Sequence, residues 1–127
     1  MSHKPSLLLV EDDPLFVLNL EDLLIDAGYM VFAALHGDAA IAELSSEPER
    51  FSCLVTDIRL GTQSDGWAVA QHARAMNPDI AVIYISGRTA DWGTVGVSDS
   101  VMLQKPFEPD LLTATIVRLT GAAQPIV

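Results

Sequence analysis

The chain has 127 residues, half of them apolar and 19% charged, so it can bury a hydrophobic core and is too apolar for a disordered chain. Its 7 basic and 17 acidic residues give a formal net charge of −10. This balance argues against direct binding to nucleic acid or to an anionic membrane, since both attract Lys and Arg clusters. There is no signal peptide and no apolar run near the roughly 20 residues of a membrane helix, so we expect a cytoplasmic protein.

Short apolar runs alternate with segments of helical spacing along the chain. The first run, Leu7–Val10, is too short for a buried helix and predicts a strand covered on both faces. Asp13 and Pro14 then suit the N-cap and first turn of a helix, and Gly28 suits its end. Further strands are expected at residues 29–34, 53–56, 81–85 and 102–104. Further helices are expected at residues 37–44, 67–77 and 110–119.

The segment Gly87–Val101 has no sustained helical period and contains Gly93 and Gly96, so we expect at most a short or irregular fourth helix there. Strands that alternate with helices indicate an α/β fold. The expected architecture is a doubly wound five-stranded parallel sheet of flavodoxin-like order, 2-1-3-4-5, with helices on both faces. We predict a single domain over residues 1–127, with a core at residues 6–120 followed by a tail.

The single cysteine and the histidines do not indicate a reactive site. Cys53 cannot form an internal disulfide, which suits a reducing compartment. It lies inside an apolar strand, so we expect a buried core residue and not a nucleophile. His3, His36 and His72 are scattered and lack the spacing of metal ligands.

Acidic residues follow two of the predicted strands at the point where each strand ends. Glu11 and Asp12 come after the first strand, and Asp57 comes after the third. In a flavodoxin-like sheet these strands flank a topological switch point, so their carboxyl ends face one crevice. Three carboxylates there would repel one another without a cation, and such oxygen ligands suit Mg²⁺ or Mn²⁺. The alternative is that Glu11, Asp12 and Asp13 only cap a helix, and Asp13 fits that role best.

A lysine and a hydroxyl group end two further strands. Lys105 comes directly after the fifth strand, and Ser86 ends the fourth strand before Gly87. An aspartate beside a bound Mg²⁺ and a lysine can attack phosphorus, because carboxylates form aspartyl phosphates and the cations neutralise the incoming group. We therefore predict that Asp57, Lys105 and Ser86 act on a phosphoryl group, although Ser86-Gly87 taken alone also describes a simple turn.

Four motifs lie in order along the chain, each at the end of a predicted strand: LLLVEDDP at 7–14, LVTDIRL at 54–60, VIYISG at 82–87 and QKPF at 104–107. Together they resemble the receiver domain of response regulators in two-component signalling, over essentially the whole chain. The resemblance implies that Asp57 is the phosphoacceptor. It further implies that Asp12 binds Mg²⁺ directly, that Glu11 acts mainly through metal-bound water, and that Arg59 offers its main-chain carbonyl to the metal.

The resemblance also assigns the remaining motif residues and the partners. Ser86 takes the position of the family's hydroxyl residue and Lys105 that of its lysine. Pro106 follows at a place that the family often fills with a cis peptide bond. A histidine kinase or a histidine phosphotransfer protein would supply the phosphoryl group. The receiver would catalyse only its own phosphorylation and dephosphorylation, as a monomer or a phosphorylation-dependent dimer.

The sequence departs from the family pattern in three places. The loop Leu60–Gly66 lacks the usual proline and is one residue longer, which should alter access to Asp57. Met102 stands where the family often has an aromatic residue, so we expect either a graded repacking upon phosphorylation or a plain core residue. The segment Ser86–Lys105 is a few residues shorter than usual, which predicts an unusual output surface with Trp92 as a candidate contact.

Two arginines occupy positions that tune the phosphoryl lifetime in the family. Arg59 and Arg88 lie two residues after Asp57 and Ser86. Their guanidinium groups could stabilise the anion or hinder the attacking water. The alternative is that both are ordinary solvated arginines.

Four functions fit these residues to different degrees. The first is a phosphorylation switch that changes its binding to a protein partner, and a phosphorelay intermediate or phosphate sink fits the same site. A phosphohydrolase with an aspartyl phosphate would need a second aspartate where Arg59 stands, and chain length for a cap. A binding module independent of phosphorylation would have no use for the full set of acids, Ser86 and Lys105.

Overall fold

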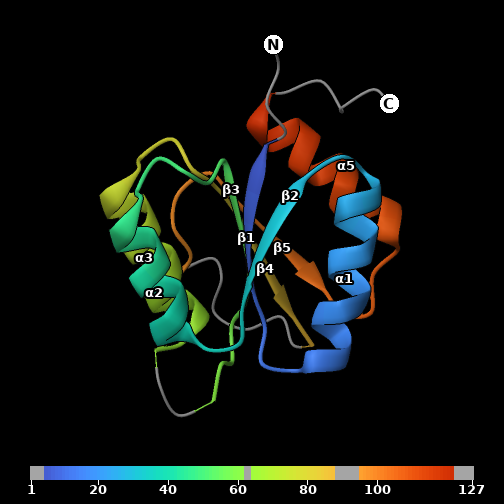
Figure 1. Cartoon of the computed structure of the whole chain (residues 1–127), viewed down its shortest axis with the longest axis horizontal. Coiled ribbons are helices and arrows are strands. Elements are labelled where there is room, and N and C mark those ends of the chain that lie inside the picture. Colours follow the sequence, from blue (N-terminus) through green and yellow to red (C-terminus); the bar gives the residue numbers. More distant parts are fainter. Residues whose placement is uncertain (1–4, 62–63, 88–94, 122–127) are drawn as a thin grey trace.

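The computed structural model describes residues 5–61, 64–87 and 95–121. Its centre is a sheet of five parallel strands with helices packed on both faces (Figure 1). The strands are β1 Ser6–Val10, β2 Met30–Ala34, β3 Cys53–Asp57, β4 Ala81–Ser86 and β5 Ser100–Gln104. The described helices are α1 Pro14–Asp26, α2 Gly37–Ser46, α3 Gly66–Met76 and α5 Pro109–Thr120. Within these ranges no helix is long and apolar enough to cross a membrane.

The strand order is β2-β1-β3-β4-β5, and every neighbouring pair runs parallel, which confirms the predicted sheet. Parallel strands all end at one edge of the sheet, which is where open α/β sheets place their ligands. Val10 lies beside Thr56, and Ser86 lies beside Gln104. The acids after β1, the aspartate that ends β3 and the lysine after β5 therefore share this edge.

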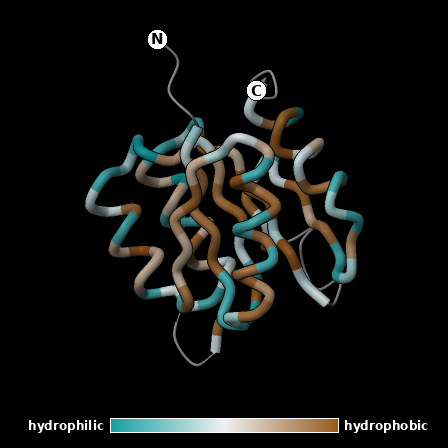
Figure 2. Tube along the Cα trace, turned by 45° about the vertical axis from the view of Figure 1, so that its right-hand side comes forward, coloured by the Kyte–Doolittle hydropathy of each residue, from teal (hydrophilic) through white to brown (hydrophobic). Residues whose placement is uncertain are grey.

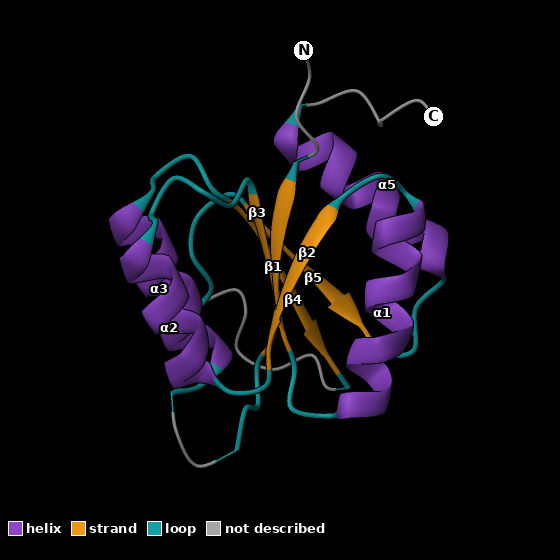
Figure 3. Ribbon diagram, in the orientation of Figure 1, coloured by secondary structure: helices purple, strands orange, loops and turns teal. Residues whose placement is uncertain are grey.

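Helices α1 and α5 cover one face of the sheet, and α2 and α3 cover the other (Figure 3). Successive side chains of a strand point to opposite faces, so the core divides into two clusters. Leu8 and Leu54 pack towards α2 and α3, whereas Leu9 and Val55 pack towards α1 and α5. The central strands form the hydrophobic middle of the molecule (Figure 2). Apart from Thr56 and Tyr84, the polar side chains of β3 and β4 are those of Asp57 and Ser86, at the ends of the strands.

Most element bounds agree with the predicted ones to within two residues. The third strand extends one residue further than predicted, because Asp57 still pairs with Ile85 of β4. The short or irregular fourth helix was expected within Gly87–Val101, and residues 88–94 of that segment lie outside the described ranges.

The fifth strand begins at Ser100, two residues earlier than predicted. Polar Ser98-Asp99-Ser100 resembles a turn in the sequence, but Ser100 pairs with Val82 of β4. Just before the strand, Arg74 of α3 donates a hydrogen bond of 2.6 Å to the carbonyl oxygen of Ser98. Pairing and this contact from a neighbouring helix determine where the strand begins, and neither is visible in the local sequence.

Cys53 is fully buried in β3, as predicted. Burial raises the pKa of its thiol to about 12, because the thiolate would lose its hydration. We expect the native protein to resist labelling by a thiol reagent at about pH 8 and to be labelled fully in denaturant, since the thiolate is the reactive form. A time course followed by intact-mass measurement tests this expectation. Complete labelling of the native protein within the mixing time would contradict it.

Candidate functional site

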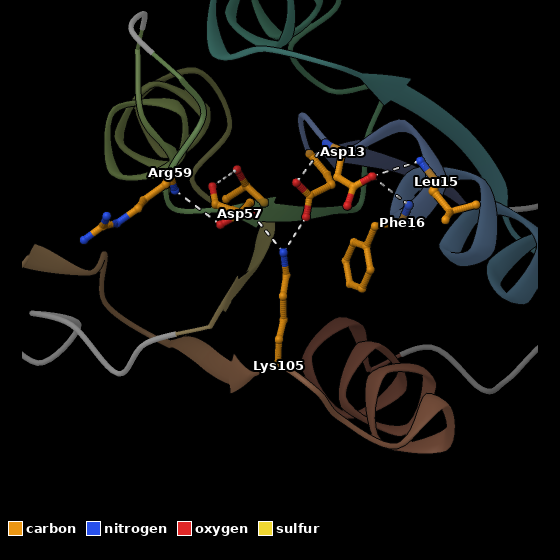
Figure 4. A network of polar contacts seen from close by, with 8 residues as sticks. Asp13, Leu15, Phe16, Asp57, Arg59 and Lys105 are labelled. Carbon is orange, nitrogen blue, oxygen red and sulfur yellow. Dashed lines mark hydrogen bonds and ion pairs between the residues drawn. The ribbon is translucent and has the colours of Figure 1, made fainter.

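Asp57 is the last residue of β3, and its side chain faces the edge of the sheet where the strands end (Figure 4). The residue is 8% exposed. Its Oδ1 accepts a hydrogen bond of 3.2 Å from the backbone amide of Arg59, and its Oδ2 lies 3.0 Å from Nζ of Lys105. The carboxylate is thus held at both oxygens and is largely buried where β3 ends.

Glu11 follows β1 directly and is only 1% exposed. Its backbone amide donates to the carbonyl of Ala34 at 3.1 Å, which continues the β1–β2 pairing by one residue. Its Oε1 lies 2.5 Å from Nζ of Lys105, and its Oε2 accepts a hydrogen bond of 3.2 Å from the amide of Asp13. Lys105 therefore bridges Glu11 and Asp57.

The charges at the sheet edge are not balanced. Burial raises the pKa of Glu11 to about 7, and the nearby charge of Asp57 adds to the effect, while the hydrogen bond from Lys105 opposes it. Burial lowers the pKa of Lys105, but its hydrogen bonds and ion pairs with the two acids outweigh this effect and raise the pKa above its usual value. The edge therefore favours an additional cation.

Three of the predicted metal ligands come together. One carboxylate oxygen each from Glu11, Asp12 and Asp57 can lie within 4.8 Å of one another. Such a group of hard oxygen donors fits Mg²⁺ or Mn²⁺, which binds carboxylates and keeps several waters, and the exposure of Asp12 leaves space for those waters. Asp13 serves α1 instead, because its Oδ1 accepts hydrogen bonds from the amides of Leu15 and Phe16 at 3.1 and 3.4 Å. The prediction that Asp13 is a helix cap is confirmed.

Ser86 and Lys105 meet where β4 and β5 end. Ser86 is 6% exposed, and its carbonyl oxygen accepts a hydrogen bond of 2.7 Å from the backbone amide of Lys105. The peptide bond between Lys105 and Pro106 is cis, as the resemblance implied. The predicted hydroxyl residue and the predicted lysine are therefore neighbours at the same edge as Asp57.

Met102 is half-buried and lies beside Tyr84 in the β4–β5 register. Its side chain packs against the core cluster under α2 and α3. This position agrees with the alternative that Met102 is an ordinary core residue. Tyr84, which the sequence did not single out, is fully buried, with its ring centroid 4.7 Å from that of Trp67. Its hydroxyl oxygen accepts a hydrogen bond of 3.0 Å from the amide of Val97. A buried aromatic side chain is thus present on β4, next to β5, where Met102 occupies the position at which the family often has an aromatic residue.

The loop after Asp57 is closed by a residue that the sequence did not single out. The amide of Gly66 donates to the carbonyl of Ile58 at 2.7 Å. A Cβ atom on Gly66 would lie 2.1 Å from the carbonyl oxygen of Asp57, so only glycine fits this approach. On the far side of the loop, Ser64 donates to Oδ1 of Asp38 at the start of α2. In the sequence, the signal for this role was the position of Gly66, nine residues after Asp57 and directly before the predicted helix.

Other predicted residues are placed only in part. The backbone amide of Arg59 donates to Asp57, and the role of its carbonyl oxygen as a metal ligand stays a prediction. Arg88 and Trp92, predicted as a tuning residue and an output contact, lie outside the described ranges.

Comparison with known proteins identifies the class. The sequence model of the response regulator receiver domain family matches residues 7–117. A response regulator receiver protein from Brucella abortus, CpdR, is 33% identical over 120 residues, which cover 92% of this chain and 98% of that protein. The chain therefore belongs to the response regulator receiver domain family.

Solved structures agree with this assignment. A response regulator receiver protein from Sinorhizobium medicae superposes with a TM-score of 0.90 at 38% identity, covering 94% of this chain and 97% of that one. The receiver domain of a sensor histidine kinase from Pseudomonas aeruginosa superposes with a TM-score of 0.79 at 26% identity, covering 94% and 100%. That domain has a magnesium ion coordinated in its active-site cleft.

Proposed function

We propose that this protein is a phosphorylation switch in which Asp57 accepts a phosphoryl group and the phosphorylated protein changes its binding to a protein partner. The observation that carries the proposal is the arrangement of Asp57, with Lys105 at 3.0 Å and two further carboxylates nearby. The donor would be a phosphohistidine of a histidine kinase or a histidine phosphotransfer protein, in the cytoplasm. A relay intermediate or phosphate sink would use the same chemistry.

The chain's own residues suffice for the nucleophile and for one cationic contact. A carboxylate oxygen of Asp57 attacks phosphorus, the bond from phosphorus to the donor nitrogen breaks, and the phosphoryl group becomes an acyl phosphate on Asp57. Lys105, held between Glu11 and Asp57, contributes positive charge to the transferred group. Ser86, which ends β4 at the same edge, would donate its hydroxyl to a phosphoryl oxygen.

A metal ion belongs to this proposal. Asp12 and Asp57 would bind Mg²⁺ directly, Glu11 through water, and Arg59 through its carbonyl oxygen. When bound, the ion would neutralise the carboxylates and the charge of the incoming phosphoryl group. The crowding of three acids and the raised pKa of Glu11 support this assignment.

The test is formation of a labile adduct from a small donor. Incubation with acetyl phosphate and Mg²⁺ is expected to add the mass of one phosphoryl group, which alkaline hydroxylamine should remove because acyl phosphates react with it. Excess EDTA and the variant Asp57→Asn should each abolish the adduct. Asp13→Asn is the matched control, because it removes a neighbouring carboxylate while keeping a good helix cap.

Two results would contradict the proposal. No adduct on the native protein, or an adduct that persists on Asp57→Asn, would exclude Asp57 as the acceptor. Sustained release of phosphate from phosphate esters would favour the phosphohydrolase instead.

A further inference from the structure

The aromatic ring of Phe16 lies against the ammonium group of Lys105. Phe16 belongs to the first turn of α1, and Nζ of Lys105 is 4.3 Å from the centroid of its ring. This distance is within the range of a cation–π interaction. Figure 4 shows the ring beside the lysine side chain, on the α1 side of the site. None of the motifs in the sequence pointed to this residue.

The ring is held in place from two directions. The amide of Phe16 donates to Oδ1 of Asp13, and the amide of Asp13 donates to Oε2 of Glu11, so the first turn of α1 is fixed to the site. On its other side, the ring of Phe107 meets that of Phe16 edge-on, with centroids 6.4 Å apart. The same β1–α1 connection therefore presents both Glu11 and the ring to Lys105.

The ring supplies what the carboxylates cannot. Lysine carries its charge on a flexible chain and has three N–H donors. Glu11 and Asp57 accept hydrogen bonds from two of these donors. The face of an aromatic ring also attracts the ammonium, through its quadrupole. Unlike a carboxylate, the ring binds neither a metal ion nor a proton. When Asp57 is phosphorylated, that carboxylate loses its negative charge, and the ring remains as an unchanged contact.

We propose that Phe16 is a positioning residue, whose ring face holds the ammonium of Lys105 in place for phosphoryl transfer to Asp57. This inference rests on the proposed function for its catalytic part, while the ring–ammonium contact itself stands on the geometry alone. The competing explanation is that the ring only fills space between α1 and Phe107. The two explanations differ in whether the electron density of the ring matters.

Ring electronics can be changed with little change in shape. Phenylalanine with one, two or three fluorines at position 16 should slow adduct formation from acetyl phosphate in steps, to roughly threefold at the end of the series, since fluorine weakens the quadrupole. Phe16→Leu should be slowed at least as much, and Phe16→Trp should retain the native rate. The same fluorinated series at Phe51 is the matched control and should show no trend, because Phe51 is buried under α2 and α3 and lies before β3, at the opposite end of that strand from Asp57.

A second measurement keeps the contact separate from the chemistry. In the native protein, ring current should shift the ε-methylene protons of Lys105 upfield, and Phe16→Leu should remove the shift. A flat fluorine series at position 16 would overturn the positioning role, and an unshifted lysine resonance would overturn the contact. If the native protein formed no adduct at all, the proposed function and the positioning role would both fail, and the resonance would still decide whether the ring holds Lys105.

Discussion

Lys105→Met is expected to slow phosphorylation of Asp57 by about a hundredfold or more, because removal of one preorganised donor from a reacting site has an effect of this order. Lys105 is the cation that the structure places within 3.0 Å of Asp57. Methionine keeps much of the length and apolar volume of lysine and removes the charge. The rate is measured as initial adduct formation from acetyl phosphate with saturating Mg²⁺.

The same substitution should also destabilise the metal-free protein, by about 3 kcal/mol at high pH, because it leaves buried Glu11 without its cation. Burial already raises the pKa of Glu11 to about 7, and loss of Lys105 would raise it further. A carboxyl with a raised pKa makes the folded state bind more protons than the unfolded state, so its folding stability falls as pH rises. The loss should therefore be largest above about pH 8 and shrink towards about pH 5.

Urea unfolding in EDTA across this pH range measures the stability change. Arg118→Met removes a cation from the last turn of α5 and should leave rate and stability nearly unchanged. Lys105→Arg keeps the charge. It should retain a larger share of the native stability than of the native phosphorylation rate, because guanidinium geometry differs from that of ammonium. A native phosphorylation rate in Lys105→Met would show that the lysine has no part in the chemistry.

Gly66→Ala is expected to destabilise the protein by about 3 kcal/mol and to slow phosphorylation, because the added methyl group has no room. Its Cβ would lie 2.1 Å from the carbonyl oxygen of Asp57 and 2.8 Å from Cα of Ile58. Both atoms belong to the backbone that carries Asp57, the proposed acceptor, so the clash is relieved only if that backbone moves. A displacement of about 1 Å at a reacting group can slow a reaction by about a hundredfold.

The matched control is Gly87→Ala, which places a methyl group where no heavy atom lies within 4 Å. Urea unfolding should show a large effect at Gly66 and almost none at Gly87. The amide resonance of Arg59, which donates to Asp57, should shift in Gly66→Ala and report the movement of the backbone. Equal stability of the two variants would mean that the loop accommodates the methyl group without disturbing Asp57.

The fold, and the meeting of the candidate site residues at one edge of the sheet, were predictable because the pattern of this sheet is simple. Strands buried on both faces read as short apolar runs, and polar residues at their carboxyl ends must then meet at one edge. Glu11, Asp57, Ser86 and Lys105 all follow from that rule. The cap function of Asp13 followed from its place before Pro14.

The contacts that support these residues were not predictable from local pattern. Phe16 reads as one more apolar residue of an amphipathic helix, and its contact with Lys105 depends on how the fold brings the first turn of α1 to the residue that follows β5. Gly66 reads as part of a polar loop, and its need for glycine depends on a close approach to β3. Tyr84 reads as a strand residue, and its hydroxyl partner lies 13 residues further along the chain. All three depend on contacts between separate elements.

The burial of Glu11 beside Asp57 makes the site a compromise between folding and function. A chain selected for stability alone would not enclose a carboxyl group at 1% exposure and leave its pKa near 7. Three acids against one lysine weaken the metal-free protein, and a cation that bound only the folded state would restore the lost stability. Under the proposed function, occupancy of this one site by a cation would therefore raise the stability of the whole domain.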